Sequence, residues 1–373
     1  MTASLVKGFC PGALRPMASG DGLVVRIRPF GGCLSPEQVA GIAELSKAFG
    51  NGVIDLSARA NVQLRGVSAE THAPLLEGLR ALNLLDASED IERRRNIVVT
   101  PFWTEGDATH SISRRLTEAL CEPGAPDLPH KFGFAVDTGL EPVLQTASAD
   151  IRLERAADGM LLVVADGMDT GKPVTELQCV EEALRLARWF MKNRTDQNRM
   201  ARLIPGQTLI DFDTPRQLHH QIAVPGNTPQ GTLAGFAFGQ LSADTFHQLA
   251  MLGPLRITPW RMVLVEGAKS IPDIDGVITT PDNPLLRITA CTGAPACSQA
   301  LGPTRTLART LAAHLKPTQH LHISGCAKGC AHPRPAPLTL TATKTGFDLA
   351  IMARAGDTPA ATDLSTDDII KAL

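Results

Sequence analysis

An internal repeat constrains the fold of this 373-residue chain more than any other feature. Residues 22–66 contain a strand pattern at 23–28, a turn, a helix opened by Ser35, Pro36 and Glu37, and a second strand pattern at 53–65. The same order recurs as a strand near 233–238, a turn at 239–240, a helix opened at Ser242 and a strand at 255–265 that ends at Gly267. Self-similarity of this kind predicts a duplicated structural unit.

The segments that follow each copy also correspond. A strand, a helix and a strand are predicted at 96–100, 110–120 and 131–136, and again at 285–289, 302–315 and 319–323. Between the copies we predict a hairpin at 150–164, a helix at 175–194 and a crossover linker rich in Pro, Gly and Asn. The chain is too long for one ordinary core, so it should form several lobes.

Two predicted strands of the first copy carry a polar face. In the segment 53–65, which we predict to be one continuous strand, apolar and polar residues alternate without interruption. The strand at 23–28 places Arg26 and Arg28 on one face. A solvated sheet face would explain either strand alone, but arginines on two adjacent strands suit the recognition of carboxylates. Only the first copy is expected to bind anions, because the second copy has apolar residues opposite Arg59, Asn61 and Gln63.

Four cysteines near the C-terminus form two closely spaced pairs, Cys291 with Cys297 and Cys326 with Cys330. Each pair follows a predicted strand, so two neighbouring strand ends could present four thiolates to one point. The gaps within the pairs are wider than the two-residue gaps typical of zinc ribbons and knuckles, and they suit a 4Fe-4S cluster. A structural zinc site and four unrelated buried thiols are the alternatives.

Composition argues against several other classes of function. The chain is 43% hydrophobic and 20% charged with a net charge of −2, which gives no electrostatic reason to expect a nucleic-acid or membrane partner. It has no apolar run of about eighteen residues, and residues 1–17 lack the apolar core of a signal peptide, so we expect a cytoplasmic protein. The remaining cysteines, which we expect to be packing thiols, are Cys10, Cys33, Cys121 and Cys179.

Together these features resemble the sulfite and nitrite reductase superfamily. The motifs that carry the resemblance are the duplicated layout, the two cysteine pairs and the sequences at 57–63, 95–98 and 128–132. The resemblance implies an α+β fold in which two ferredoxin-like half-domains pair about a pseudo-twofold axis and two α/β lobes are attached. It divides the chain into a first half-domain at 1–85, a first lobe at 90–206, a linker at 207–230, a second half-domain at 231–280 and a second lobe at 283–373.

The resemblance also implies the ligands. A 4Fe-4S cluster would be held in the second lobe by Cys291, Cys297, Cys326 and Cys330, and a tetrapyrrole would lie beside it. The residues expected to surround this macrocycle and its carboxylates are Arg26, Arg28, Arg59, Asn61, Gln63, Arg65, Arg95 and Lys131.

Within the superfamily the chain most resembles the precorrin-3B synthase family. The second cysteine pair lacks the asparagine that the reductases usually carry midway between those cysteines. The reductases bind sulfite or nitrite with two lysines that are two residues apart on one strand. Here Lys131 has Gly133 at the second position, so half of this lysine pair is missing. The residues from Cys10 to Leu23 resemble the start of the synthases, and the chain is shorter than a typical assimilatory reductase.

This resemblance implies an iron–sulfur monooxygenase of aerobic cobalamin biosynthesis. Its substrates would be precorrin-3A and dioxygen, with a hydroxyl formed at C20 and a γ-lactone closed by the ring A acetate. An external reductase or ferredoxin should donate electrons, because the sequence has no glycine-rich dinucleotide-binding loop. A mononuclear non-haem iron is also implied. Its candidate ligands, each of which could instead be a hydrogen-bond partner of the cluster, are His320, His322 and His332.

Two alternatives belong to other classes. The chain could be a sirohaem-dependent sulfite or nitrite reductase, which would use the tetrapyrrole as a cofactor. It could also be a non-enzymatic iron–sulfur carrier or a zinc-stabilised binding module, although a carrier needs far fewer residues and no arginine-lined sheet. The adjacent His219 and His220 lie in the predicted linker and are expected to be solvated.

Overall fold

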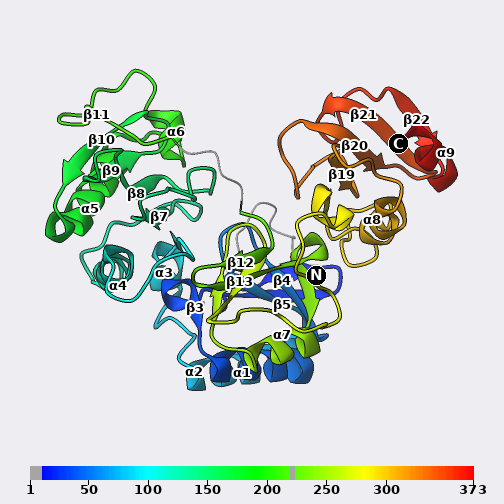
Figure 1. Ribbon diagram of the computed structural model, residues 1–373, viewed down its shortest axis with the longest axis horizontal. Helices are drawn as coiled ribbons and strands as arrows, with labels where there is room; N and C mark the ends of the chain where they lie inside the picture. Colours follow the sequence, from blue (N-terminus) through cyan, green and yellow to red (C-terminus); the bar gives the residue numbers. More distant parts are fainter. Residues whose placement is uncertain (1–10, 219–222) are drawn as a thin grey trace, which may run out of the picture.

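The computed structural model describes residues 11–218 and 223–373, which form a central body and two lobes (Figure 1). The central body contains two antiparallel sheets, ordered β1-β2-β5-β4-β14 and β12-β13-β16-β15-β3. The strands of the first sheet are β1 (Met17–Ser19), β2 (Gly22–Ile27), β5 (Val62–Val67), β4 (Val53–Leu56) and β14 (Gln240–Ser242). Those of the second sheet are β12 (Gly226–Thr228), β13 (Gly231–Phe236), β16 (Met262–Glu266), β15 (Leu255–Ile257) and β3 (Cys33–Leu34).

Each half of the central body donates one short strand to the sheet of the other half. β14 pairs with β4, where Gln240 lies opposite Asp55, and β3 pairs with β15, where Cys33 lies opposite Arg256. Backbone hydrogen bonds therefore join the two halves at two equivalent places. This reciprocal exchange confirms the duplicated α+β fold with its pseudo-twofold arrangement.

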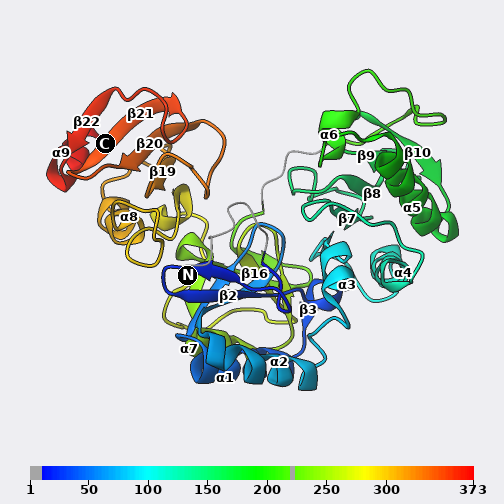
Figure 2. The same cartoon turned by 180° about the vertical axis from the view of Figure 1, so that it is seen from behind.

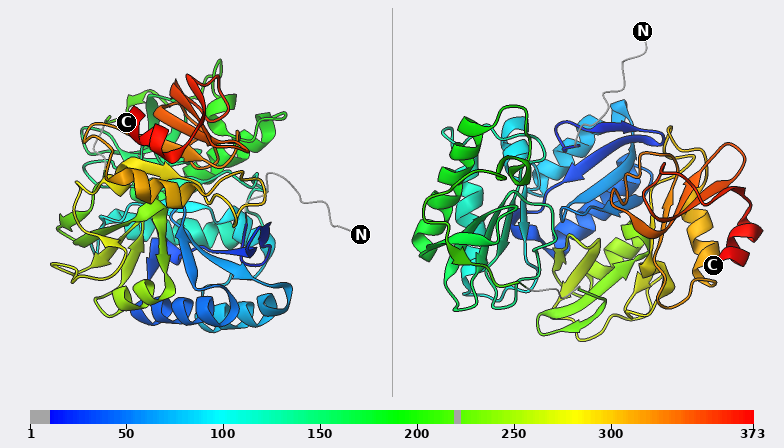
Figure 3. Two further views of the ribbon diagram at one scale, coloured as in Figure 1. Left: turned by 90° about the vertical axis from the view of Figure 1, so that its right-hand side faces the viewer. Right: turned by 90° about the horizontal axis from the view of Figure 1, so that it is seen from above.

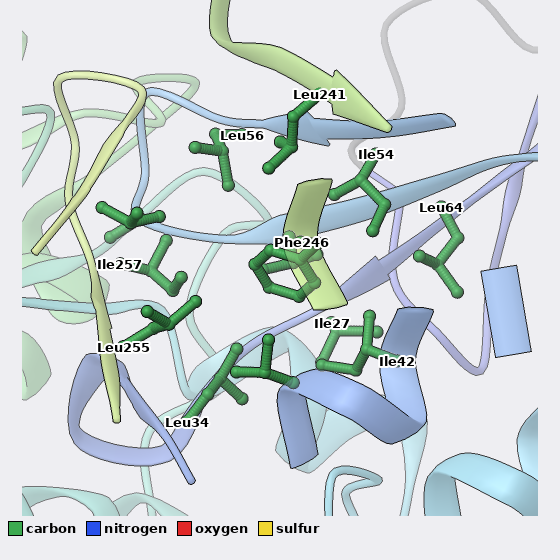
Figure 4. Close-up of a cluster of buried hydrophobic side chains, with 14 of the residues drawn as sticks. Ile27, Leu34, Ile42, Ile54, Leu56, Leu64, Leu241, Phe246, Leu255 and Ile257 are labelled. Carbon is green, nitrogen blue, oxygen red and sulfur yellow. The ribbon is translucent and has the colours of Figure 1, made fainter. Parts of the chain in front are cut away.

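Helices α1 (Pro36–Phe49), α2 (Ala69–Ala81) and α7 (Ala243–Ala250) lie together beneath the paired sheets (Figure 2). The α1 helix begins where predicted, because the Ser35 hydroxyl accepts from the Gln38 N–H and the Gln38 side chain accepts from the Ser35 N–H. Apolar residues of both halves, including Ile42 and Phe246, meet between the helices and the sheets (Figure 4). Both side chains are fully buried, and each such burial contributes about 1.5–3 kcal/mol.

The prediction of one continuous strand at 53–65 is wrong, because this segment is the β4–β5 hairpin. The chain reverses at residues 57–61, where the Ser57 N–H donates to the Asn61 carbonyl and Ala60 has a φ of 53°. The arms pair so that their even-numbered side chains share one face, which preserves the alternation that suggested a single strand. The prediction at 255–265 is wrong for the same reason, since β15 and β16 flank a turn in which Arg261 has a φ of 61°.

The first lobe contains a sheet ordered β11-β10-β9-β8-β7-β6, in which β6, β7 and β8 are parallel. The predicted strand at 131–136 begins only at Phe134, so Lys131 lies in the turn before it. The strands are β6 (Ile97–Val99), β7 (Phe134–Asp137), β8 (Ile151–Arg155), β9 (Leu161–Ala165), β10 (Thr170–Val174) and β11 (Thr214–Pro215). The helices are α3 (Glu89–Arg94), α4 (Ala108–Cys121), α5 (Glu176–Asn193) and α6 (Met200–Leu203).

The second lobe contains a sheet ordered β18-β19-β20-β21-β22, in which β18, β19 and β20 are parallel. The predicted strand at 285–289 is wrong in its first part, where the chain forms a 3-10 turn, η3 (Pro284–Arg287). The strands are β18 (Ile288–Ala290), β19 (Leu321–Ser324), β20 (Ala336–Ala342), β21 (Phe347–Ala353) and β22 (Ala361–Leu364). The helices are α8 (Thr304–Ala312) and α9 (Thr366–Ala372).

The two lobes stand on either side of the central body, away from the layer of α1, α2 and α7 (Figures 1 and 3). The predicted linker at 207–230 contains β11 and β12 and is therefore only partly irregular. The remaining short elements are η1 (Phe30–Gly32), η2 (Ala237–Gly239) and β17 (Val277–Ile278). No helix within 11–218 or 223–373 has the length and apolar character that crossing a membrane requires.

Candidate functional site

The cysteine pairs lie at the ends of two parallel strands of the second lobe. β18 and β19 are neighbours, and the Cys291 N–H donates to the Ile323 carbonyl at 3.2 Å. Cys326 follows the end of β19, so the parallel register brings both strand ends to the same edge of the sheet. The Gly325 N–H donates to the Cys291 Sγ at 3.1 Å, which places the first cysteine against the loop of the second pair.

Cys297 and Cys330 are presented by the two loops that follow these strands. The Cys297 N–H donates to the Gly293 carbonyl at 2.8 Å. Gly293 and Gly329 have φ angles of 72° and 59°, a backbone conformation that glycine adopts at little cost. The glycines noted in the sequence therefore shape both loops around their cysteines.

The thiol of Cys330 lies close enough to cysteines of both pairs for their charges to affect its pKa. Burial raises the pKa of the Cys330 thiol, and the charges of Cys326 and Cys291 raise it further against the opposing effect of Lys328. Within the described residues, no three His, Cys, Asp or Glu side chains form a group that could hold a single metal ion. A 4Fe-4S cluster separates its cysteines more than one zinc ion does, because each thiolate binds a different iron. That these four cysteines hold a cluster stays a prediction.

A row of polar side chains crosses the first sheet on the face opposite its apolar core. The strand register sets Arg26, Gln63, Asp55 and Gln240 side by side on β2, β5, β4 and β14. Arg26 Nη2 donates to Gln63 Oε1 at 2.7 Å, and Gln240 Nε2 donates to Asp55 Oδ1 at 3.0 Å. The second half of the chain thus completes the polar row through its exchanged strand β14.

Direct contacts join this sheet to the loop of the first cysteine pair. The Ser19 hydroxyl and the Gly20 N–H both donate to the Ala296 carbonyl, at 3.0 and 3.1 Å. Arg65 Nη2 donates to the Ser19 hydroxyl at 3.0 Å. Because Ala296 precedes Cys297, the polar sheet and the thiols are neighbours.

Arg59, Asn61 and Lys131 lie where the first half-domain meets the first lobe. Arg59 is in the hairpin turn, where its Nη1 donates to the Lys131 carbonyl at 3.1 Å and its Nη2 to the Ser148 hydroxyl at 3.2 Å. Lys131 is exposed. Asn61 is buried, and its Nδ2 has no hydrogen-bond partner among the described residues. An unsatisfied buried amide is costly unless a ligand completes its bonding.

Three of the predicted site arginines are buried and paired with carboxylates of the protein itself. The pairs are Arg28 with Glu92 at 2.7 Å, Arg65 with Asp21 at 2.7 Å and with Asp55 at 3.1 Å, and Arg95 with Asp86 at 2.7 Å. A buried charge needs such compensation, so each of these arginines has a structural partner before any ligand arrives. That they contact macrocycle carboxylates stays a prediction, and their internal pairing favours a positioning role.

Sequence reasoning missed two arginines that lie near Asp55, where the first sheet meets the second lobe. Arg305, in the first turn of α8, donates from Nη1 to Asp55 Oδ1 at 3.4 Å. Arg261, in the turn between β15 and β16, lies close enough to Asp55 and Arg305 for their charges to affect its pKa. The repeat could have revealed Arg261, because it occupies the turn position that Ala60 occupies in the first copy. Nothing in the sequence places α8 against β4, so Arg305 could not be found.

The candidate histidines of the second lobe occupy different environments. His320 is exposed and lines a cavity of about 420 Å³. His322 is buried without a hydrogen-bond partner for either ring nitrogen among the described residues. Burial, followed by the charge of His332, lowers the pKa of His322 to about 4. The rings of His322 and His332 are 5.5 Å apart, but no third ligand joins them among the described residues, so the implied mononuclear iron has no complete ligand set there.

Among the isolated cysteines that the structure describes, Cys179 is buried as a packing thiol should be, whereas Cys33 and Cys121 are only partly buried. Burial raises the pKa of Cys33 to about 11 and that of Cys179 to about 12, and burial also raises the pKa of Cys121. The predictions for Cys10 and for the pair at 219–220 lie outside the described residues.

Comparison with known proteins agrees with this geometry. A profile described as the nitrite/sulfite reductase ferredoxin-like half domain matches residues 15–82. The solved structure of the Mycobacterium tuberculosis NirA protein is similar in fold over 94% of this chain and 79% of that chain, with a TM-score of 0.67 and 17% sequence identity. A ferredoxin–nitrite reductase of Synechococcus elongatus is 26% identical over 90% of this chain and 78% of that protein.

A second relative is more similar in sequence. A precorrin-3B synthase of Sinorhizobium sp is 30% identical over 402 aligned residues, which cover 96% of this chain and 86% of that protein. Identity at this level over nearly the full length of both chains relates them as whole proteins and not through one shared domain. The chain belongs to the precorrin-3B synthase family, an oxidoreductase family of the nitrite/sulfite reductase superfamily.

Proposed function

We propose that the protein is a precorrin-3B synthase, which uses dioxygen to hydroxylate precorrin-3A at C20 and closes a γ-lactone with the ring A acetate. One observation carries the proposal: the β1–β2 turn of the first sheet, whose Ser19 also accepts from Arg65, is hydrogen-bonded to the loop of the first cysteine pair. The bonds from Ser19 and Gly20 to Ala296 are this connection. A tetrapyrrole bound on the sheet would thus lie next to the thiols.

The polar surface suits a macrocycle fringed with acetate and propionate arms. Arg26 and Gln63 lie on the sheet, and Arg59 lies at its edge beside the Lys131 turn. Guanidinium groups bind carboxylates through two parallel hydrogen bonds. In this proposal Arg26 and Arg59 contact the arms of the substrate, while the buried pairs of Arg28, Arg65 and Arg95 hold the sheet in shape.

The proposed reaction requires an electron supply. One oxygen atom enters the macrocycle and the other leaves as water, so the balance needs two electrons and two protons. A 4Fe-4S cluster, held by Cys291, Cys297, Cys326 and Cys330, would pass electrons one at a time when bound. An external reductase or ferredoxin is the proposed donor, and it could approach through Cys330, which is exposed.

The same site fits a sulfite or nitrite reductase less well. The positive charges of Arg28 and Arg95 are compensated internally by Glu92 and Asp86, which leaves less positive charge for a small anion. A Cβ at Gly133 would lie 2.6 Å from the side-chain amide nitrogen of Asn96 and 2.9 Å from the backbone carbonyl oxygen of Asn96. The second lysine of the reductase anion site therefore has no room here.

Spectra of anaerobically purified protein, followed by one assay, test the proposal. We expect absorbance and EPR signals of a 4Fe-4S cluster without sirohaem bands. We also expect precorrin-3A to gain one oxygen atom, detected by mass spectrometry, only when both dioxygen and an electron donor are supplied. Sirohaem bands with sulfite or nitrite reduction would replace this function with the alternative, and a colourless zinc protein would exclude both.

A further inference from the structure

Asp55 is the meeting point of three parts of the fold. It accepts hydrogen bonds from Arg65 of the same hairpin at 3.1 Å, from Gln240 of the second half at 3.0 Å and from Arg305 of the second lobe at 3.4 Å. Arg65 is also paired with Asp21. Arg65 therefore has full compensation from two carboxylates, whereas Arg305 shares one carboxylate that is already engaged.

Arg261 adds a second arginine to this place. Its backbone has a φ of 61°, and its side chain packs so closely on Gly239 that a Cβ there would lie 2.6 Å from the Arg261 Cβ. Burial lowers the Arg261 pKa, the charge of Arg305 lowers it further, and Asp55 opposes both. Among the described residues Arg261 makes no hydrogen bond or ion pair. Half-buried and without a paired carboxylate, this guanidinium lacks the compensation that buried charges normally require.

Arg305 is held in an unfavourable place for a cation. It lies in the first turn of α8, whose N-cap, Pro303, makes no capping hydrogen bond. The N-terminal end of a helix carries partial positive charge, which disfavours a neighbouring cation. The Arg305 side chain is only 18% exposed, and its Nε is buried without a hydrogen-bond partner. Two arginines and a helix N-terminus thus create a local positive excess around one shared carboxylate.

Arg261 is accessible to a ligand, because it lines the cavity of about 420 Å³ between the second half-domain and the second lobe. The cavity walls are mostly apolar and include Phe238, Trp260 and Met262. Apolar walls with a guanidinium beside them suit an amphipathic acid better than an inorganic anion. A tetrapyrrole edge that carries methyl groups and carboxylate arms has this chemistry.

We propose that Arg261 and Arg305 together bind one carboxylate arm of the tetrapyrrole substrate, adding a contact from the second half-domain and the cysteine-bearing lobe to those of the first sheet. The proposal rests on the proposed function for the identity of the substrate. Its physical content is that the carboxylate supplies the hydrogen bonds which Arg261 lacks and adds negative charge beside Arg305, which shares Asp55 with other donors. Because one arm would contact two lobes, its binding would also fix the macrocycle relative to the thiols.

The test uses cluster-loaded protein with the variants Arg261→Gln and Arg305→Gln. We expect each variant to raise the Kd and KM for precorrin-3A by ~10- to 100-fold, the effect of losing hydrogen bonds to a charged group, with little change in kcat. The Kd is measured without dioxygen by quenching of tryptophan fluorescence. The matched control is Arg114→Gln, which removes an exposed arginine on α4 of the first lobe. It should bind precorrin-3A as the wild type does.

Other outcomes separate the two proposals. Unchanged Kd and KM in both variants, with an effect of Arg59→Gln, would overturn the carboxylate subsite and leave the proposed function standing. Absence of binding and turnover in the wild-type protein would instead overturn the proposed function. A reduced kcat at unchanged KM would also overturn the subsite, because it would mean that the arginines do not bind the ground-state substrate. Thermal melting and the cluster absorbance must match the wild type, and the Arg261→Lys and Arg305→Lys variants repeat the measurement if either glutamine variant fails to fold.

Discussion

At the level of single residues, Arg59 differs from Arg28, Arg65 and Arg95 in what its guanidinium contacts. The other three are buried against carboxylates, whereas Arg59 donates to the Lys131 carbonyl and to the Ser148 hydroxyl, both neutral acceptors. These contacts hold Arg59 at the edge of the polar sheet, beside the first lobe. In the proposed function an arm of the macrocycle reaches Arg59 at this edge.

The Arg59→Ala variant should therefore bind precorrin-3A about tenfold more weakly, because a hydrogen bond to a charged group is lost. The cluster absorbance should be unchanged. Anaerobic titration monitored by fluorescence measures the affinity, and Arg114→Ala, which removes an exposed arginine on α4, is the matched control. Loss of the cluster absorbance in Arg59→Ala would show that this turn has only a structural role.

Replacing Cys326 with alanine should have the opposite effect. The cluster absorbance and EPR signal should be lost, since one of four thiolate ligands is missing, while precorrin-3A should still bind to the sheet. Cys121→Ala, which removes a half-buried packing thiol, should keep the cluster. An intact cluster spectrum in Cys326→Ala would contradict the assignment of the ligands.

The buried carboxyl group of Asp137 should make the free energy of unfolding depend on pH. Burial raises its pKa from 3.8 to about 6, although the Leu144 and Val143 N–H groups donate to it and lower the pKa in part. Because the folded-state pKa lies above the unfolded value, the folded form gains stability as the pH falls from 6 towards 4 and loses it as the pH rises through this window. Asp137→Asn resembles the protonated form. Relative to wild type it should gain roughly 3 kcal/mol between pH 4 and pH 7 in denaturant unfolding. A pH-independent difference would contradict the raised pKa.

At the level of elements, the β4–β5 hairpin places the polar residues of the segment 53–65. The turn at 57–61 moves Arg59 off the sheet face and towards the first lobe, while Asp55 and Gln63 stay opposite each other. The polar residues that seemed to form one row therefore lie in two places: Asp55 and Gln63 on the sheet, and Arg59 at its edge against the first lobe. The corresponding β15–β16 turn carries Arg261, so both turns bring a cation to a junction with a lobe.

Substitution of Ala60 tests the hairpin directly. Ala60 has a φ of 53°, which a β-branched residue adopts only with strain. Ala60→Val should therefore lower the free energy of unfolding by ~1–3 kcal/mol, and Ala60→Gly should be tolerated. Chemical denaturation measures both variants. In a continuous strand valine would be favoured instead, so a stabilised Ala60→Val would contradict the turn.

At the level of the whole molecule, the duplication places equivalent charge pairs against different lobes. Arg65 and Asp55 form the pair in the first copy, and Arg256 and Glu266 form it in the second with the charges reversed. Asp55 contacts Arg305 of the second lobe, whereas Arg256 packs 3.8 Å from the centre of the Trp103 ring in the first lobe. The two halves thus use the same framework to hold different partners, and the exchanged strands β3 and β14 tie them together.

The exchange of strands predicts that damage in one half spreads to the other. Leu34 belongs to the first copy but pairs with Leu255 in the second sheet, and it is fully buried. Leu34→Ala should cost ~2–5 kcal/mol, and hydrogen exchange should accelerate in both central sheets. Leu120→Ala, an equally buried change in the first lobe, should leave exchange in β15 and β16 unaffected. Faster exchange confined to the first sheet in Leu34→Ala would contradict a jointly folded central body.

The sequence alone determined the features that depend on local pattern. The repeat, the helix start at Ser35 and the two cysteine pairs are set by spacing along the chain, and they identified the α+β fold, the family and the thiol group. The tertiary structure decided which charges face a ligand and which face each other. Arg28 and Glu92 are 64 residues apart, and Arg305 and Asp55 are 250 apart, so neither pairing leaves a periodic signal in the sequence. The hairpin at 53–65 could not be recognised from the sequence, because even-numbered residues face the same side in both of its arms. The alternation of apolar and polar residues is therefore the same in a hairpin and in one continuous strand, and only long-range packing distinguishes these structures.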